Sequence, residues 1–279
     1  MAVDLHVHSS ASDGTDPPGV VVAKAAEVGL SALALTDHDT LTGIPAARSA
    51  ATGLPIELIP GVELSVDHAG MKIHMLAYFL EPTNGPLQDR LAELRSGRNT
   101  RNQLIVRRLN ELGYSITMED VLHHADGDAV GRPHIADALV ESGAFEARSD
   151  AFVDLLGDGG SAYFERMRLT AIEAITLTTE SGGVTSIAHP LTITADAATL
   201  RSIFEALRNA GLAGFEAHYA EYPPAVRTQL AAVAADLGLV ATGGSDYHGT
   251  GKPDLHIGSG RGDLVVPDSR LEELRRRRP

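Results

Sequence analysis

Two histidines near the start of the chain are spaced so that both can bind one metal ion. His6 and His8 are separated by one residue within an apolar segment, and Asp13 follows in the turn-forming run SASDG. In a β-strand, side chains at i and i+2 leave the same face, so the two imidazoles point to one side of the sheet. The same pair also occurs on edge strands with both rings in water, and alone it is weak evidence for a metal.

Five further segments place a histidine, aspartate or glutamate at or near the end of an apolar run. They are TDHD at 36–39, GVE at 61–63, IH at 73–74, AHP at 188–190 and GSDYH at 244–248. This repetition disfavours the solvent-exposed alternative. The chain contains no cysteine, so any metal has only nitrogen and oxygen ligands, and cysteine nucleophiles are excluded.

The composition limits the partners that the protein can have. A formal net charge of -14 over 279 residues argues against binding long duplex nucleic acid, which requires a basic face. No apolar run approaches the length that spans a bilayer, and the first strand begins without a signal-like segment. We therefore expect a soluble, cytoplasmic protein without a membrane partner. The arginine run at 275–278 is expected to be a solvated chain end.

Apolar, β-rich segments alternate with helical patterns over most of the chain. The segments lie near 2–7, 32–36, 56–63, 72–79, 184–188, 213–217 and 239–243. Pro17 and Pro18 open one helix that Gly29 closes, and Gly211 and Gly238 close two later ones. This alternation predicts a parallel sheet with crossover connections. Because closure brings all carboxyl ends of the strands to one mouth, we expect an α/β fold of the (β/α)7 TIM-like barrel type.

One interval, residues 86–168, interrupts this alternation with purely helical periodicity. Leucines repeat at helical spacing from residue 87, Thr117 matches a capping start, and Arg132 with Pro133 opens a further helix. We expect a barrel domain made of 1–85 and 169–279, with 86–168 as an all-helical insertion that covers the mouth and selects the substrate. The alternative is a helical decoration that adds only stability.

Together these motifs resemble those of the polymerase and histidinol phosphatase (PHP) family, which are metal-dependent phosphoesterases built on a distorted (β/α)7 barrel. The resemblance covers nearly the whole chain and rests on DLHVHS with SDG, TDHD, GVELS with IHMLAY, IAHP and GGSDYH. The GRPHIADAL run at 131–139 resembles the branch that acts on nucleoside bisphosphates and small nucleotides. Composition and periodicity by themselves do not indicate that branch.

The resemblance implies a centre of three divalent metal ions. The implied ligands are His6, His8, Glu63 and Asp246 for one metal, Glu63 with His74 and His189 for a second, and Asp13, His38 and His248 for the third. Imidazole and carboxylate ligands suit Mn, Fe or Zn. Some relatives carry a histidine in place of Asp13, and an aspartate there favours Mn or Fe. Asp37, counted among the catalytic residues, and Asp39 flank His38 and are expected to orient it.

Phosphate-ester hydrolysis also needs positive charge for the phosphoryl oxygens and a proton for the leaving group. Arg132, with His134 beside it, is our candidate for gripping a phosphate. His218 ends a strand without a place in the three metal sets, so it is our candidate for phosphate contact or general acid. The alternatives are an ordinary surface position for Arg132 and a structural hydrogen bond for His218. The histidines at 68, 123, 124 and 256 are expected in water.

The expected activity is hydrolysis of small phosphomonoesters. Nucleoside 3',5'-bisphosphates or nucleoside monophosphates are the favoured substrates, with 5'-to-3' trimming of short oligoribonucleotides as an extension. A histidinol-phosphate-type phosphatase is one alternative. An amidohydrolase-type deaminase or amidase is another, but it would need a bridging lysine at the end of a middle strand, and Lys72 lies at the start of its strand. A catalytically silent nucleotide-binding module would be expected to have lost ligand positions, all of which are filled here.

Overall fold

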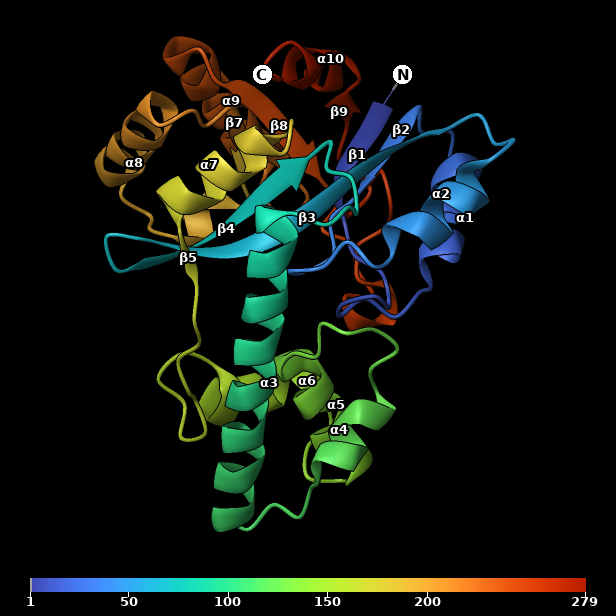
Figure 1. Ribbon diagram of the computed structural model, residues 1–279, viewed down its shortest axis with the longest axis vertical. Coiled ribbons are helices and arrows are strands. Elements are labelled where there is room, and N and C mark those ends of the chain that lie inside the picture. Colours follow the sequence, from blue (N-terminus) through green and yellow to red (C-terminus); the bar gives the residue numbers. More distant parts are fainter. Residues whose placement is uncertain (1) are drawn as a thin grey trace.

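A nearly closed sheet forms the centre of the molecule in the computed structural model, which describes residues 2–279 (Figure 1). Its strands are β1 (Ala2–Val7), β2 (Ala32–Leu35), β3 (Glu57–His68), β4 (Met71–Tyr78), β5 (Leu169–Thr170), β6 (Val184–Ile187), β7 (Gly214–Tyr219), β8 (Val240–Gly244) and β9 (Val266–Pro267). The order across the sheet is β8-β7-β6-β4-β3-β2-β1-β9, and β5 pairs with β3. The ends of β1 and β8 meet, because the Asp246 N–H donates to the His6 carbonyl at 2.8 Å.

The predicted α/β barrel is confirmed, and each of the seven predicted strand segments corresponds to a strand. The two additional strands, β5 and β9, contain two residues each, which is too short for an alternating pattern to be visible in the sequence. They extend the edges of the sheet: β5 pairs with the end of β3, and β9 pairs antiparallel with the start of β1.

β4 runs in the opposite direction to its neighbours. It pairs antiparallel with both β3 and β6. Only Ala69 and Gly70 connect it to β3, and their φ values of 52° and 80° are those of a tight two-residue hairpin turn. The expectation of an entirely parallel sheet is therefore wrong at β4. As a result His74 lies in the first half of its strand and not at the carboxyl end.

Helices cover the outer face of the sheet. They are α1 (Pro18–Glu27), α2 (Ile44–Ala51), α7 (Ala171–Glu180), α8 (Ala197–Asn209), α9 (Pro224–Leu237) and α10 (Ser269–Arg275), with short 3-10 turns at Pro190–Thr192 and Gly249–Gly251. In α8 the buried residues are Leu200, Ile203, Phe204 and Leu207, the spacing of one helix face, and Phe204 stacks on Phe215 of β7 with ring centroids 4.0 Å apart. Each such side chain contributes about 1.5–3 kcal/mol of hydrophobic stabilisation.

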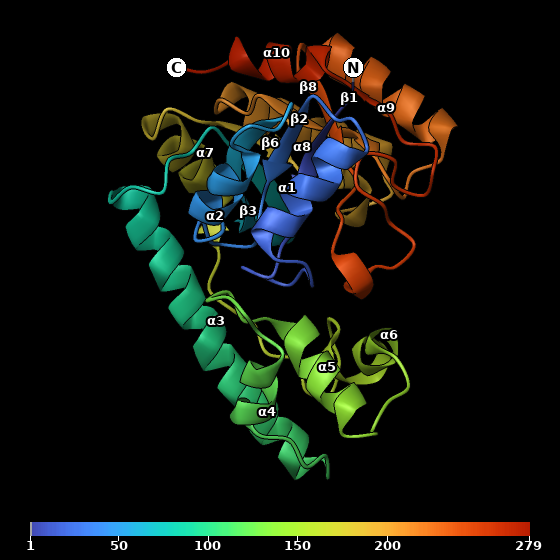
Figure 2. The same cartoon turned by 90° about the vertical axis from the view of Figure 1, so that its right-hand side faces the viewer.

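Residues 86–168, which we call the insertion, form α3 (Pro86–Glu111), α4 (Met118–His123), α5 (Arg132–Glu141), α6 (Arg148–Ala151) and a π-helical turn at Phe152–Leu156. These helices lie together on one side of the barrel, opposite α10 and the chain ends (Figures 1 and 2). Thr117 and Asp120 cap α4 reciprocally, and an apolar cluster that includes Ile105, Leu139 and Leu155 holds the helices together. None of the helices in residues 2–279 has the length and apolarity to cross a membrane.

Candidate metal-centred active site

Nine side chains that the sequence marked as metal ligands come together at the end of the barrel that faces the insertion. They are His6, His8, Asp13, His38, Glu63, His74, His189, Asp246 and His248, and each approaches another of the set within 3.4 Å through a ring nitrogen or a carboxylate oxygen. All but His74 lie at or beyond the middle of a strand or in the loop that follows it. Because the set spans most of the chain, only closure of the sheet brings its members together.

Glu63 lies at the centre of this cluster. Its Oε2 lies 3.0–3.3 Å from ring nitrogens of His6, His8 and His38, and its Oε1 lies 2.9–3.2 Å from those of His74 and His189. Burial alone would raise the pKa of this carboxyl group, but the charges of the histidines outweigh burial and hold the pKa of Glu63 well below its usual range. An ionised carboxylate that touches rings on both of its oxygens is arranged as a bridging ligand.

The donor atoms fall into three overlapping groups. Within each group the atoms lie within 4.8 Å of one another, and the groups are His6, His8 and Glu63; His38, Glu63 and His74; and His8, Asp13, His38 and His248. Asp246 adjoins the first group, since its Oδ1 lies 3.5 Å from Nε2 of both His6 and His8. The grouping differs from the one implied by the sequence resemblance, because His8 and His38 each belong to two groups.

The backbone is strained at two members of the cluster. His189 has φ 28° and Asp246 has φ 51°, values that non-glycine residues rarely adopt. The neighbouring glycines allow a close approach of strands, since a Cβ on Gly244 would lie 2.4 Å from the His6 nitrogen and one on Gly243 would lie 2.2 Å from the His218 oxygen. These two glycines therefore serve a tight backbone approach beneath Asp246.

Groups outside the nine orient the rings and carboxylates. Glu216 of β7 contacts the His6 Nδ1 through Oε1 at 3.1 Å and accepts the His189 N–H through Oε2 at 2.7 Å. The Asp246 Oδ2 accepts hydrogen bonds from the Tyr219 hydroxyl at 2.8 Å and from the Lys252 Nζ at 2.5 Å. Such partners fix the direction and basicity of metal-binding groups. Sequence patterns did not single out Glu216, Tyr219 or Lys252.

Asp37 and Asp39 hold the backbone on either side of His38. The Asp37 carboxylate accepts hydrogen bonds from the backbone and hydroxyl of Ser9 at 2.8 and 2.7 Å and from the Ser12 hydroxyl at 2.6 Å, and it does not line the cavity over the cluster. These contacts agree with the positioning role expected for Asp37 beside His38, and its catalytic role stays a prediction. Asp39 pairs with two arginines: Arg98 of α3 and Arg166, the latter at 2.8 Å.

A cavity of about 370 Å³ lies over the cluster, and both the barrel and the insertion line it. Beside members of the cluster, its walls contain Pro133, Arg148 and Phe152 from the insertion and Thr192, Tyr219, Gly251 and Lys252 from the barrel. Arg148 is held by Asp137 of α5 through two contacts of 2.7 and 2.5 Å. Arg148 and Lys252 are the cationic side chains that line this cavity among the described residues.

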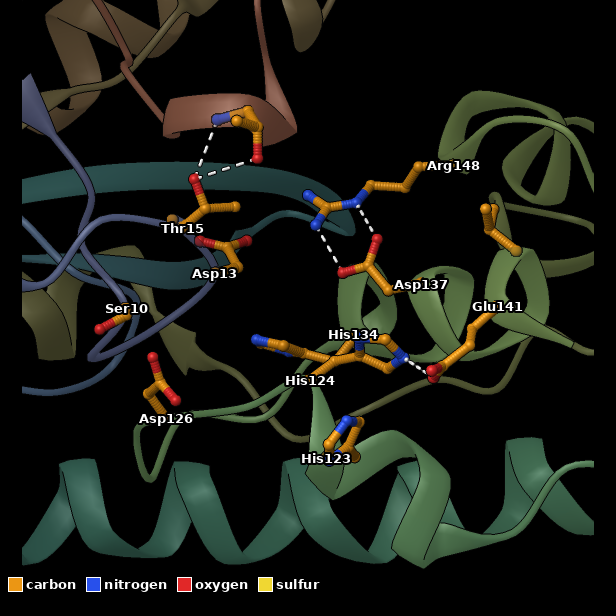
Figure 3. A pocket seen from close by; sticks show the side chains of 13 residues that line it. Ser10, Asp13, Thr15, His123, His124, Asp126, His134, Asp137, Glu141 and Arg148 are labelled. Carbon is orange, nitrogen blue, oxygen red and sulfur yellow. Dashed lines mark hydrogen bonds and ion pairs between the residues drawn. The ribbon is translucent and has the colours of Figure 1, made fainter.

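A wider groove of about 550 Å³ adjoins that cavity and shares Asp13 and Arg148 with it. Figure 3 shows Ser10, Asp13 and Thr15 on the barrel side of the groove, and His123, His124, His134 and Glu141 on the insertion side. The His134 Nδ1 accepts the Gly131 N–H at 2.9 Å, so this ring caps α5 as well as lining the groove. The expectation that the rings at 123 and 124 are merely solvated is incomplete, since both form the groove wall and the His124 Nε2 lies 2.9 Å from a Glu141 oxygen.

Two of the predicted substrate-binding residues lie elsewhere. The register of β7 against β8 shifts between Glu216 and His218, and it is Tyr219, not His218, that lines the cavity over the cluster. Burial and the charges of Arg270 and Arg227 lower the pKa of His218, which places it beside cations of the outer helices. Because His218 lines neither the cavity nor the groove, its expected role as general acid or phosphate contact stays a prediction.

Arg132 lines a third, smaller cavity that shares His74 with the cavity over the cluster. Its guanidinium donates to the Leu156 carbonyl at 2.7 Å and lies 3.4 Å from a carboxylate oxygen of Asp158. These contacts tie the start of α5 to the loop after the π-helical turn. Arg132 is thus partly occupied within the insertion and does not reach the cavity over the cluster.

Comparison with known proteins identifies the family. A family profile described as "PHP domain" matches residues 4–181. The chain is 35% identical over 247 residues to the 5'-3' exoribonuclease Rnm of Salmonella typhimurium. The aligned region covers 88% of this chain and 84% of that one. It is 29% identical over 257 residues to the 3',5'-nucleoside bisphosphate phosphatase of Chromobacterium violaceum, with 92% and 90% covered.

The fold comparison agrees with the sequence comparison. A crystal structure of a Bifidobacterium adolescentis protein described as a metal-dependent phosphoesterase superimposes with a TM-score of 0.89 at 33% identity, covering 99% of this chain and 96% of that one. The barrel, the insertion and the cluster therefore occur in a chain whose sequence and fold match one family throughout. This protein belongs to the PHP family and is a metal-dependent phosphoesterase.

Proposed function

We propose that the protein releases inorganic phosphate from nucleoside 3',5'-bisphosphates and trims short oligoribonucleotides from the 5' end. The observation that carries this proposal is the donor cluster at the floor of a cavity of about 370 Å³ that continues into a polar groove of about 550 Å³. The cavity has room for a phosphoester, and the groove has room for the nucleoside or the next nucleotide. The names of two relatives, an exoribonuclease and a bisphosphate phosphatase, support the same substrate class.

The nine side chains fit divalent cations. Six imidazoles and three carboxylates converge on a small volume, and neighbouring rings lie as close as 4.1 Å between centroids. This donor set suits Mn, Fe or Zn, and we propose three ions, with Glu63 shared between two. Bound there, the ions supply Lewis-acid chemistry, polarising the phosphoryl oxygens and lowering the pKa of water.

The protein's own groups supply charge and hydrogen bonds around the reacting ester. Lys252 and Arg148 both line the cavity, one from a barrel loop and one from the insertion, so both can neutralise phosphoryl oxygens. Burial and the nearby Asp246 raise the pKa of Tyr219 far above its usual value, so its hydroxyl stays protonated and orients Asp246. Phe152 and Pro133 form an apolar part of the cavity wall, which limits the access of water to the site.

The alternatives find less support in the structure. The Lys72 Nζ contacts carboxylate oxygens of Asp158 at 2.6 Å and Glu165 at 3.0 Å, away from the cluster, and it is not arranged as the bridging lysine of an amidohydrolase-type enzyme. A catalytically silent module would not need nine assembled donors. A histidinol-phosphate-type phosphatase shares the metal chemistry and is separated only by its substrate.

The experiment is a release assay for inorganic phosphate with Mn, Fe and Zn compared. The panel contains adenosine 3',5'-bisphosphate, adenosine 3'- and 5'-monophosphates, histidinol phosphate and a 5'-phosphorylated oligoribonucleotide analysed for released mononucleotide. We expect the bisphosphate to have the highest kcat/KM among the small esters and the oligoribonucleotide to be shortened from its 5' end. Preference for histidinol phosphate, or no hydrolysis of any nucleotide with any of the three metals, would refute the proposal.

A further inference from the structure

The third cavity lies at the junction of barrel and insertion and is lined mostly by cations. Its volume is about 160 Å³, and its walls are Lys72, Ile73, His74, Arg101, Arg132, Asp158, Tyr163, Arg166 and Arg168. His74 is also a wall of the cavity over the metal-ligand cluster, so the two cavities adjoin at this imidazole. We call this third space the arginine cavity.

The charges around the arginine cavity do not balance. Arg98 and Arg166 share the carboxylate of Asp39. Lys72 and Arg132 share that of Asp158, while Lys72 and Arg168 share that of Glu165. With Arg101 added, six cationic side chains are served by three carboxylates. The excess of positive charge lies at the cavity, and an anion from outside the chain would compensate it.

Arg101 is the cation in this set for which no carboxylate partner exists among residues 2–279. It is 5% exposed, its terminal nitrogen donates to the Asn102 amide oxygen at 2.9 Å, and its Nε has no partner. Burial, together with the guanidinium groups of Arg98, Arg166 and Arg132, lowers the pKa of Arg101. An isolated buried charge of this kind is strongly unfavourable unless an opposite charge compensates it.

Arg227 shows what a structural arginine of similar burial looks like in the same molecule. It is 6% exposed, and its guanidinium donates to the backbone carbonyls of Tyr219, Ala220 and Asp263 and to the Asp263 Oδ1, at 2.9–3.1 Å. All of its nitrogens have partners. Arg101, which lines the arginine cavity, lacks this complement.

We propose that the arginine cavity binds a second phosphate of the substrate, with Arg101 as its principal ligand and Arg132 and Arg166 beside it. This inference rests on the proposed function, because it assigns the phosphate that is not cleaved. A phosphate in the arginine cavity receives charge-assisted hydrogen bonds from planar guanidinium groups, while the reacting phosphate lies over the cluster on the other side of His74. The pair of sites selects esters that carry two phosphates on one nucleoside, and in an oligoribonucleotide it selects a phosphorylated 5' end.

The test is the variant Arg101→Gln, assayed with adenosine 3',5'-bisphosphate and with adenosine 3'-monophosphate, which lacks the second phosphate. We expect kcat/KM for the bisphosphate to fall by about 100-fold, the loss of one or two charge-assisted contacts, while the value for the monophosphate changes less than about threefold. Arg108→Gln is the matched control, since Arg108 lies on the same helix, is exposed and pairs with Glu111. Equal losses on both substrates, or no loss on the bisphosphate, would overturn the inference.

A second measurement needs no turnover and separates this inference from the proposed function. Inorganic sulfate is added to the metal-free protein and the melting temperature is recorded for the wild type, Arg101→Gln and Arg101→Lys. We expect sulfate to raise the Tm of the wild type, the Lys variant to retain part of the rise, and the Gln variant to lose it. If nucleotides are not hydrolysed but this pattern of Tm values is observed, the anion site is supported and only the proposed function is refuted. If sulfate stabilises the Gln variant as much as the wild type, Arg101 is not the anion ligand.

Discussion

Glu63 offers the most direct test of the cluster, because its two oxygens touch five imidazoles. Glu63→Gln keeps the shape of the side chain but removes the charge that cations need. We expect kcat/KM to fall by at least about 100-fold and the content of bound divalent metal to drop. Phosphate release and elemental analysis measure the two effects. Glu57→Gln, on the exposed start of the same strand, is the control and should retain wild-type rate and metal content.

Adjacent residues of β7 are expected to behave in opposite ways. His218→Asn should change kcat by less than about threefold, because the ring lines neither the cavity nor the groove. Tyr219→Phe removes the hydroxyl that donates to Asp246 and should lower kcat by about tenfold or more. Both variants are assayed on a nucleotide and on p-nitrophenyl phosphate. A loss in His218→Asn confined to the substrate with the poorer leaving group would restore the general-acid assignment.

At this scale the sequence was informative where chemistry is concentrated in local motifs. His6 and His8 are two residues apart at the end of β1, so their shared direction follows from strand geometry. Asp246 and His248 are also two residues apart, but they lie in the loop after β8. Arg101, Arg148 and Lys252 carry no such signal, since isolated cations are common on any surface. Their positions depend on which helices and loops face the cavities, which only the folded chain determines. The sequence pattern placed His218 at the site, whereas in the structure Tyr219 lines the cavity. This difference arises from the irregular register of β7 and β8, which strict alternation cannot predict.

Among the elements, the meeting of β1 and β8 controls the geometry of the cluster. Gly244→Ala would place a Cβ 2.4 Å from the His6 nitrogen, so the two strands must separate. We expect a loss of stability of about 1–3 kcal/mol, measured by chemical denaturation, together with a loss of activity. Gly97→Ala, within α3, is the control because the nearest atom to its Cβ would be 3.5 Å away, and Ala favours a helix. A stable and active Gly244→Ala protein would show that the barrel closes less tightly than described.

Element types were more predictable than strand direction. Hydrophobic runs located the seven principal strands, and proline, glycine and capping signals located the starts of α3, α4 and α5. The direction of β4 was missed because alternation along a strand carries no information about direction. Only the short connection Ala69–Gly70 indicates the hairpin. This signal is weak, because Ala is an unusual residue for such a turn. α6 and the following π-helical turn are too short to give a periodic pattern.

For the whole molecule, metal should contribute to stability as well as to activity, since the ligands join both edges of the barrel. Ligands that bind only the folded state at about 100 times their Kd add about 2.7 kcal/mol, which for a chain of this size corresponds to a Tm rise of roughly 5–10 °C. We therefore expect a chelator to lower the Tm by that amount and added Mn, Fe or Zn to restore it. Differential scanning calorimetry measures the effect. Asp246→Asn should reduce the chelator-induced shift, and an unchanged Tm in chelator would argue against binding at this cluster.

Asp39 gives the two halves of the molecule a common electrostatic element. Its neighbour in the chain, His38, belongs to the cluster, and its carboxylate pairs with Arg98 of α3 and Arg166, which lines the arginine cavity. Cations in the cluster and the proposed anion in that cavity would attract each other across the shared His74, so their binding free energies would be coupled. Thermodynamic reciprocity then requires that substrate tighten metal binding by the same factor by which metal tightens substrate binding. The enzyme would thus need less metal for half-maximal activity as the substrate concentration rises, and its apparent KM for substrate would fall as metal is added.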